Sequence, residues 1–256
     1  MTPNPGDLLA VRYDMTMVVW SYLMSVAGSF LALECARLLR HKDGTVDWTM
    51  VGGAALMLGG VGIWTMHFIG MQAYRLAVPI AYDGLLTILS LVAAIVIAGL
   101  ALYLSGGSGK FSLRGWIAGG VIAGIGVCVM HYMGMYAQVM RARMTLDMTI
   151  VGISVVIAIT AALAALWLAF NVRQRSLRVA AAAVMGIAVC VMHYTGMSAA
   201  SMICLEAAPT VAFKITSGRL PEWTLGIALT TMMLVLTLFT SRVMTEGEAR
   251  TSAARA

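Results

Sequence analysis

Three histidines of the sequence lie in copies of one short motif, and the residue types around them suit metal binding. The copies are WTMHFIGMQA at residues 64–73, CVMHYMGMYA at 128–137 and CVMHYTGMSA at 190–199. Each copy has one methionine directly before the histidine and another four residues after it. Imidazole nitrogen and thioether sulfur form a soft ligand set that favours copper, especially Cu(I). The motif therefore predicts a metal site built from repeated units.

The order of the candidate ligands follows from helix geometry. Residues four apart share a helix face, so each histidine faces the same way as the methionine that follows it. The primary candidates are His67, His131 and His193. The methionines four residues later come next, followed by those directly before each histidine: Met71, Met135, Met197, Met66, Met130 and Met192. Zinc and haem iron are weaker alternatives to copper, because zinc gives no reason for the methionines and haem needs only two copies.

Acids and cysteines near the motifs are minor candidates. Cys128 and Cys190 lie three residues before a motif histidine, but a buried cysteine usually serves as a small packing residue. Three acids begin the odd-numbered apolar segments: Asp14, Asp83 and Asp147. We predict that they cap helices, with acceptance of an N–H from a ligand histidine as the alternative role. A histidine inside a membrane can also serve only as a hydrogen-bonding group between helices.

The composition indicates a membrane protein. Hydrophobic residues make up 61% of the 256 residues and charged residues only 11%, whereas soluble domains carry about 25% charged residues. Seven apolar segments are long enough to cross a bilayer: 15–37, 49–73, 84–104, 116–140, 148–170, 178–204 and 223–241. We therefore predict an all-α polytopic fold with seven transmembrane helices. The spans show no nucleophile–base pair and no phosphate-binding loop, so we do not expect an enzyme.

The spacing of the motifs predicts an internal repeat. Each motif lies toward the end of an even-numbered span, and each of the first three odd-numbered spans starts with an acid. The repeated unit is thus an antiparallel helix pair, used three times, with a seventh helix added. One shared metal requires the histidine nitrogens to lie roughly 3 to 4 Å apart. We expect the second, fourth and sixth spans to form an inner layer, with the acids around its mouth.

Charge gives the expected orientation. One side of the membrane would carry 11 of the 17 lysines and arginines, and the richer side is normally cytoplasmic. This places the N-terminus outside, the C-terminus inside and the motifs toward the outer face. The net charge of +6 then reflects topology and contact with the lipid bilayer, with no nucleic acid. Residues 1–244 form the predicted membrane domain, and 245–256 a disordered cytoplasmic tail.

Two features near the cytoplasmic side are assigned structural roles. Glu34 and Arg37 lie one turn apart at the end of the first span and are expected to form an ion pair. His41 stands between Arg40 and Lys42 in a loop. It is therefore excluded from the metal site.

The motif Met-His-aromatic-x-Gly-Met resembles the MHYT family of bacterial integral-membrane sensor domains. The third copy, Met192 to Thr195, spells the family name, and the resemblance covers about residues 8 to 243. It implies a signal-input domain of the bacterial inner membrane that binds copper through the motif residues. The implied signal is a diatomic gas (oxygen, carbon monoxide or nitric oxide) or the metal ion itself. Output would pass to a cytoplasmic signalling domain or partner protein not present in this chain, and a homodimer is a further expected partner.

A metal transporter or channel using the same histidines and methionines is the alternative, since repeats are common among transporters. The motifs lie at one depth, and no histidine continues them through the inner half of the membrane, which argues against transport. A purely structural assembly protein is the third hypothesis.

Overall fold

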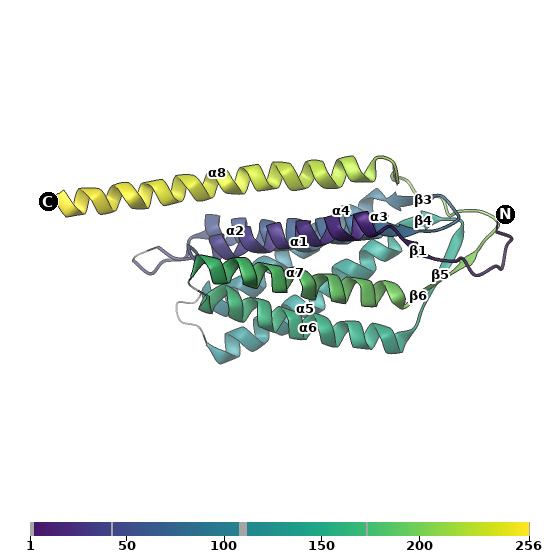
Figure 1. Cartoon of the computed structure of the whole chain (residues 1–256), viewed down its shortest axis with the longest axis horizontal. Helices are drawn as coiled ribbons and strands as arrows, with labels where there is room; N and C mark the ends of the chain where they lie inside the picture. The colour runs from purple at the N-terminus through teal and green to yellow at the C-terminus, as the bar shows by residue number, and fades with distance from the viewer. Residues whose placement is uncertain (1–2, 42, 108–111, 173, 256) are drawn as a thin grey trace.

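The computed structural model describes residues 3–41, 43–107, 112–172 and 174–255, in which seven long helical segments run side by side (Figure 1). The second segment is continuous through α2 (Trp48–Ala55), the π-helical η1 (Leu56–Thr65) and α3 (Met66–Ala73). The others are α1 (Met15–Ala36), α4 (Gly84–Leu102) continued by η2 (Tyr103–Gly107), α5 (Leu113–Tyr136), α6 (Met148–Asn171), α7 (Arg175–Ser198) and α8 (Leu220–Arg255). Each is long and apolar enough to cross a membrane, in agreement with the predicted spans.

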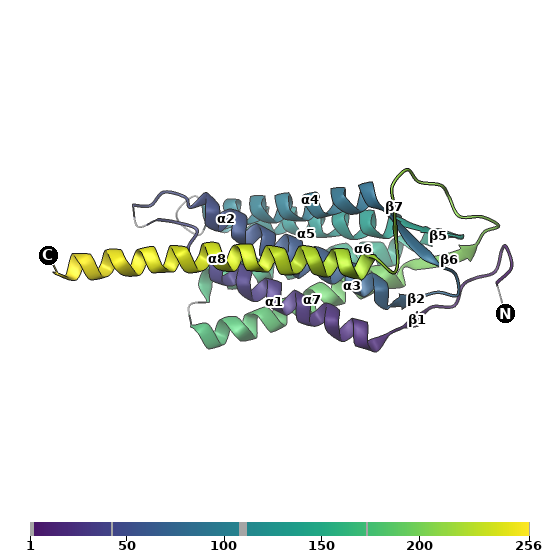
Figure 2. The same cartoon turned by 90° about the horizontal axis from the view of Figure 1, so that it is seen from above.

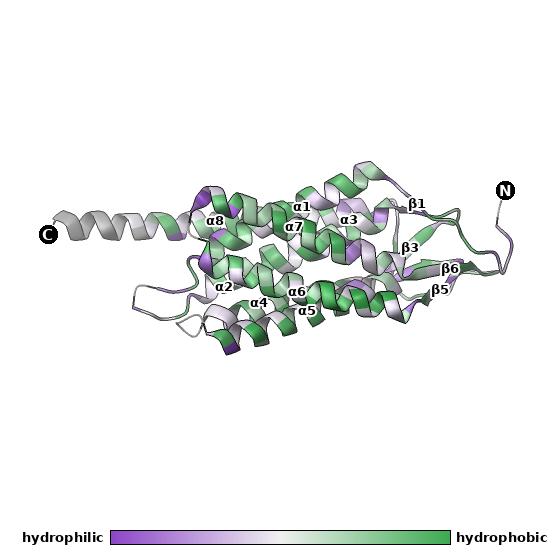
Figure 3. Cartoon of the chain, turned by 60° about the horizontal axis from the view of Figure 1, so that its bottom comes forward, coloured by the Kyte–Doolittle hydropathy of each residue, from purple (hydrophilic) through white to green (hydrophobic). Residues whose placement is uncertain are grey.

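The distribution of hydropathy follows the same pattern. Apolar residues cover most of the length of the helices, and the more hydrophilic positions gather toward the two ends of the bundle (Figure 3). Large apolar side chains also face outward along the spans, such as Val96 at 61% exposure and Val156 at 65%. A hydrocarbon surrounding is the environment in which such faces are stable.

Aspartates begin four of the helices. Asp14, Asp83 and Asp147 start α1, α4 and α6, and Asp47 starts α2. Each carboxylate accepts hydrogen bonds from two backbone N–H groups of the first turn, over 2.8–3.4 Å. These N–H groups have no partner within the helix. The predicted N-cap role of the three repeated acids is confirmed.

Short strands, absent from the sequence prediction, gather at one end of the bundle, which we name the strand end (Figure 2). They are β1 (Arg12–Tyr13), β2 (Tyr74–Arg75), β3 (Ile80–Asp83), β4 (Gln138–Met140), β5 (Ala142–Leu146), β6 (Ala200–Cys204) and β7 (Lys214–Thr216). The predicted spans 116–140 and 178–204 are too long at this end. The reason is that β4 and β6 continue the apolar run after α5 and α7 have ended.

The strands join the helices in pairs. Each strand that enters an odd-numbered span pairs with the strand that leaves the next motif helix: β1 with β2, β3 with β4, and β5 with β6. One main-chain hydrogen bond, from the N–H of the capping aspartate to an alanine carbonyl, recurs in each pair. Its instances are Asp14 to Ala73 at 2.9 Å, Asp83 to Ala137 at 2.7 Å and Asp147 to Ala199 at 2.9 Å. Main-chain bonds therefore fix the register at the strand end.

Six spans alternate around one axis. The three motif spans are the second span (α2, η1 and α3), α5 and α7. The other three spans, α1, α4 and α6, lie in the grooves between the motif spans. α1 contacts η1 and α7, α4 contacts η1 and α5, and α6 contacts α5 and α7. α8 lies outside this ring, along α2, η1 and α3 (Figure 2).

Among the spans as the structure describes them, the second is by far the most enclosed. Of its most apolar stretch, 89% is buried, compared with 33% for α5 and 39% for α7. The predicted inner layer of three motif helices is therefore wrong for α5 and α7. The seventh helix covers one motif span and leaves the outer faces of the other two open.

Charged side chains connect the helices at the opposite end, which carries the 37–47 loop and which we name the loop end. Glu34 of α1 pairs with Arg37 at 2.8 Å, as predicted, and also with the buried Arg178 of α7 at 2.7 Å. Asp47 pairs with Arg242 of α8 at 2.8 Å. The second partner of Glu34 was not predicted, because it lies 144 residues away in the sequence.

α8 continues as helix to Arg255 and projects beyond the other helices (Figure 1). The tail 245–256, for which the sequence predicts disorder, is drawn as helix as far as Arg255. This segment has no proline and is rich in alanine, glutamate and arginine, which are good helix formers. The preceding membrane helix also removes the cost of nucleation.

Candidate metal centre

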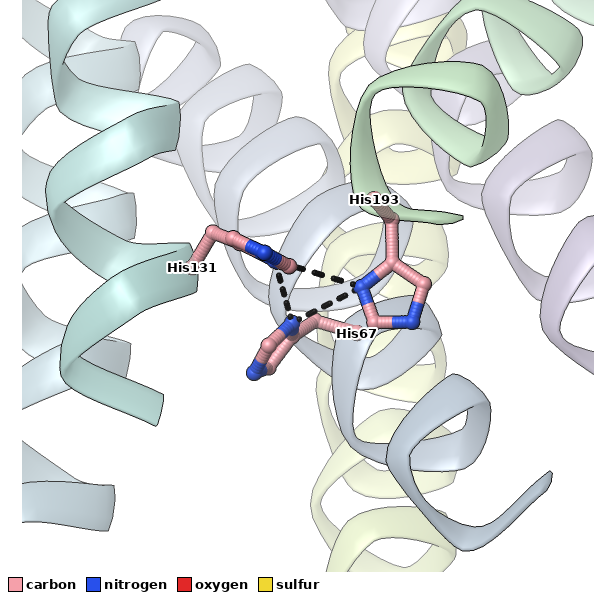
Figure 4. A group of neighbouring side chains, drawn as sticks. All are labelled: His67, His131 and His193. Carbon is pink, nitrogen blue, oxygen red and sulfur yellow. Dashed lines mark hydrogen bonds between the residues drawn. The ribbon is translucent and has the colours of Figure 1, made fainter. Parts of the chain in front are cut away.

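His67 of α3, His131 of α5 and His193 of α7 point toward one another (Figure 4). Their Nδ1 atoms form a triangle with edges of 3.0 Å (67–193), 3.1 Å (67–131) and 3.3 Å (131–193). All three side chains are buried, with at most 1% exposed. The predicted convergence of the three histidines, at roughly 3 to 4 Å between nitrogens, is confirmed.

The motif glycines make this convergence possible. Each imidazole lies against the glycine of the next motif helix around the axis, so that its Nε2 atom occupies the place of a missing side chain. A Cβ added to that glycine would lie less than 3.0 Å from the ring nitrogen. The pairs are His67 with Gly134, His131 with Gly196 and His193 with Gly70. The glycine three residues after each histidine therefore accommodates the histidine of another repeat.

Hydrogen bonds among the three Nδ1 atoms cannot give every one of them a suitable partner. In a neutral imidazole, each Nδ1 is either a donor or an acceptor, depending on the tautomer. Around a triangle the two kinds cannot alternate, so at least one pair of Nδ1 atoms must be alike. The Nε2 atoms have no hydrogen-bond partner among the described residues either, and buried polar groups without partners are costly. The arrangement therefore favours a shared ligand for the three lone pairs.

The donor set fits a metal ion. Two nitrogens bound to a tetrahedral ion at about 2.0–2.1 Å lie about 3.3–3.4 Å apart. The edges of the Nδ1 triangle, 3.0 to 3.3 Å, are at or slightly below this separation. In the described part of the chain, these histidines are also the only group of three or more His, Cys, Asp or Glu side chains placed to share an ion.

The six candidate methionines lie in two layers, all with at most 2% exposed. The methionines before the histidines line a small space on the loop side of the triad, together with one branched residue from each motif span. The lining is Met66, Met130, Met192, Ile63, Val127, Val189 and the three histidines, and the space is too narrow for a water molecule. The methionines after the histidines, Met71, Met135 and Met197, belong to the apolar core cluster beside the strands.

The minor candidates stand apart from the triad. The carboxylates of Asp14, Asp83 and Asp147 bond to their own helices, and no described acid accepts an N–H from a motif histidine. The structure thus shows these three acids as helix caps, without a hydrogen bond to the histidines. Cys128 packs in an apolar cluster with Ala158 and Met192. Within the described residues, neither Cys128 nor Cys190 joins the convergent ligand atoms.

Three serines support the triad and were missed in the sequence. Each lies seven residues after a repeated aspartate, and this spacing is the signal that could have identified them. An aromatic side chain of a motif span hydrogen-bonds to the serine of the next odd-numbered span. The bonds are Tyr132 to Ser154 at 2.7 Å, Tyr194 to Ser21 at 2.9 Å and Trp64 to Ser90 at 3.0 Å. The first repeat has Phe68 in place of the tyrosine, and Trp64 supplies the donor instead.

The strand side of the triad is closed by buried side chains. Tyr74 and Tyr82 are buried there beside the core methionines. Burial raises the pKa of Tyr74 to about 12 and raises that of Tyr82 as well. At the rim, a hydrogen bond from Arg75 holds the pKa of the Asp14 carboxyl below its usual value. Charge therefore stays at the edge of the strand end, away from the histidines.

Comparison with known proteins identifies the repeat. The family model MHYT, described as a bacterial signalling protein N-terminal repeat, matches residues 60–119, 124–182 and 186–252. Each match begins at the glycine seven residues before a motif histidine. Together the three matches span all three motifs and most of the helical bundle.

Several signalling proteins are similar along most of this chain. The bifunctional diguanylate cyclase/cyclic di-GMP phosphodiesterase MucR of Pseudomonas aeruginosa is 35% identical over 252 residues, which is 96% of this chain and 36% of MucR. An uncharacterized signaling protein of Caulobacter vibrioides is 30% identical over 89% of this chain and 27% of its own length. Signaling protein YkoW of Bacillus subtilis is 30% identical over 75% of this chain and 24% of its own length.

The chain thus spans about a third or less of the curated relatives it matches. No solved structure gives a significant match. Three matched repeats, each with its histidine in one buried triad, show that the chain belongs to the MHYT family of bacterial signalling domains.

Proposed function

We propose that this domain is a membrane signal-input module that binds one copper ion through His67, His131 and His193. The observation that carries the proposal is the buried triangle of Nδ1 atoms with edges of 3.0–3.3 Å. A copper ion held there would supply an electron-rich centre able to bind a small uncharged ligand. The protein holds the imidazoles in register and excludes water from them.

The surroundings support copper over zinc and haem. Met66, Met130 and Met192 line the same small space as the imidazoles, and thioether sulfur is a ligand type that favours Cu(I). Three nitrogens within 3.3 Å of one another leave no room for a porphyrin between them. Of the six candidate methionines, these three are the ones placed to supply an additional ligand. Met71, Met135 and Met197 are better explained as core residues.

The orientation in the membrane follows from charge. The loop end and the C-terminal part of α8 carry most of the lysines and arginines, so we assign them to the cytoplasmic side of the bacterial inner membrane. The strand end and the triad then lie toward the outer face. A reporter fused after Arg250 should behave as cytoplasmic, and one in the 205–222 loop as external.

The signal and its output are part of the same proposal. The names of the relatives describe signalling proteins, one of them a cyclic di-GMP synthesis and hydrolysis enzyme. We assign this domain an input role, with a diatomic gas (oxygen, carbon monoxide or nitric oxide) or copper itself as the signal. The output would be a cytoplasmic signalling domain or partner protein, and the domain itself would carry no catalysis.

Transport of copper is a weaker explanation of the same residues. A transported ion needs a hydrated path, because an unpaired charge in an apolar interior is costly. The space on the loop side of the triad is too narrow for water, and the region beyond it is apolar. Copper uptake into proteoliposomes separates the two functions, because a sensor should bind the ion without net flux.

Metal analysis of the purified domain in detergent tests the proposal. The wild type should bind one copper per chain, and His67→Ala, His131→Ala and His193→Ala should each lower the affinity by at least about 100-fold. The matched control is His41→Ala, at the one histidine outside the motifs. His41 lies at the loop end, so this substitution should leave copper binding unchanged. Full copper binding after loss of any one motif histidine would contradict a shared site.

A further inference from the structure

A cavity lies on the loop side of the triad, next to the small space that the histidines and their preceding methionines line. Its walls come from five of the seven spans: η1, α4, α5, α6 and α7. Half of its lining residues are alanines, namely Ala94, Ala98, Ala101, Ala123, Ala158, Ala161, Ala162, Ala165 and Ala188. It is therefore a gap left by small side chains at the centre of the membrane helices.

The lining is entirely apolar. The remaining wall residues are Gly126, Leu58, Ile63, Ile97, Val127, Leu166, Met185, Val189 and Met192, so that no charged or hydroxyl side chain among the described residues faces the cavity. The room inside for the centre of a water-sized molecule is about 60 Å³. A water molecule needs two to four polar partners to occupy such a space, and apolar cavities stay dry and bind apolar molecules such as xenon.

The cavity borders directly on the triad. Ile63, Val127, Val189 and Met192 line both the cavity and the small space that the three imidazoles enclose. An apolar molecule in the cavity would therefore contact side chains that also contact the space beside the histidines. The other side of the triad is closed by the buried methionines and tyrosines of the strand end.

A gap of this kind carries a cost. Empty space in a protein interior lowers stability in proportion to its volume, because the lining loses its packing contacts. Leucine in place of alanine would fill the gap, and leucine is abundant on the same helices. Alanines from four different helices (α4, α5, α6 and α7) line this one space, so the small residues together keep it open.

We propose that this cavity holds a small uncharged apolar molecule next to the histidine triad. If the proposed sensing function is correct, that molecule is the diatomic gas, and it reaches the triad from the hydrocarbon region of the membrane. The binding of an apolar molecule depends on the alanine lining alone and requires no metal. The identity of the gas as ligand is the part that rests on the proposed function.

Xenon is the probe for the test. Crystals of the full chain held under xenon pressure should show an anomalous xenon peak between Ala98, Val127 and Ala162. Ala162→Leu should abolish the peak. Ala164→Leu, two residues along the same helix but on its exposed face, should retain it. Ala98→Leu, from α4, provides a second variant that should also remove the peak.

Copper stoichiometry measured on the same samples separates the two proposals. All four proteins should bind copper equally, because none of these alanines belongs to the triad. Xenon binding without copper binding would overturn the proposed function and leave the cavity inference standing. An empty cavity in the wild type, or one filled by a lipid or detergent chain, would overturn the cavity inference.

Discussion

The two ends of the bundle connect the same helices by opposite means. At the strand end, main-chain hydrogen bonds recur in all three repeats, and imidazoles lie against bare glycines. At the loop end, the connections run through long charged side chains, such as Glu34 with Arg178 and Asp47 with Arg242. Main-chain contacts fix positions to tenths of an ångström, as a metal site requires. Long side chains permit larger shifts, so the loop end is the adaptable part of the molecule.

The largest effect is expected at the loop end, from Arg178→Gln. The Arg178 side chain is 5% exposed and its Nε donates to Glu34 over 2.7 Å. Breaking a buried ion pair from one side costs about 3–5 kcal/mol, so we expect the free energy of unfolding to fall by about 3 kcal/mol. The exposed partner of the same carboxylate gives the control, since Arg37→Gln should cost less than about 1 kcal/mol. Thermal unfolding in detergent measures the stability of both variants. Equal losses of stability would show that the burial of Arg178 does not strengthen its contribution.

At the strand end, Gly134→Ala tests the packing of glycine against histidine. The new methyl group would meet the His67 ring at less than 3.0 Å. Overpacking of this kind costs about 1–3 kcal/mol, and displacement of the ring should lower copper affinity at least about tenfold. Gly152→Ala is the control, because its Cβ would enter open space. A copper titration and an unfolding curve report the two effects, and an unchanged Gly134→Ala protein would refute the role of glycine.

The smallest effect is the pH dependence of the Asp47–Arg242 contact. Burial raises the pKa of Asp47, but hydrogen bonds from Arg242 and from the Met50 N–H outweigh it, and the pKa lies below its usual value. The contact therefore stabilises the fold above the unfolded pKa of about 3.9 and loses this effect as pH falls through the folded pKa. Wild type and Asp47→Asn should differ by less than about 1 kcal/mol at pH 7 and converge as the pH falls below the folded pKa of Asp47. A difference that grows on acidification would contradict this assignment.

The features predicted correctly from the sequence depend on residues close together in the chain and recur in each repeat. Spacing placed His67, His131 and His193 at equal depth, and the acid before each odd-numbered span identified the N-caps correctly. Both are local patterns, because a helix face and a helix start are each defined within a few residues. Convergence of the histidines followed from depth and repetition together.

Contacts between segments far apart in the sequence could not be predicted from such local patterns. Glu34 was assigned to Arg37, its neighbour on the helix, while the more buried partner Arg178 lies on α7. Each motif glycine accommodates an imidazole from another repeat, a contact that spacing within one motif does not predict. Apolar strands such as β6 extended the hydropathy signal of the preceding helix, so the ends of two spans were placed too far along the chain.

The continuous course of α8 has a mechanical consequence. Its 36 residues form a rod about 54 Å long at 1.5 Å per residue, which runs past the bundle and beyond it (Figure 1). The ion pair of Arg242 with Asp47 divides this rod into arms of about 33 Å and about 20 Å. If the helix turned as a rigid rod about that contact, a lateral shift of about 1 Å at Leu220 would appear as about 0.6 Å in the opposite direction at Arg255.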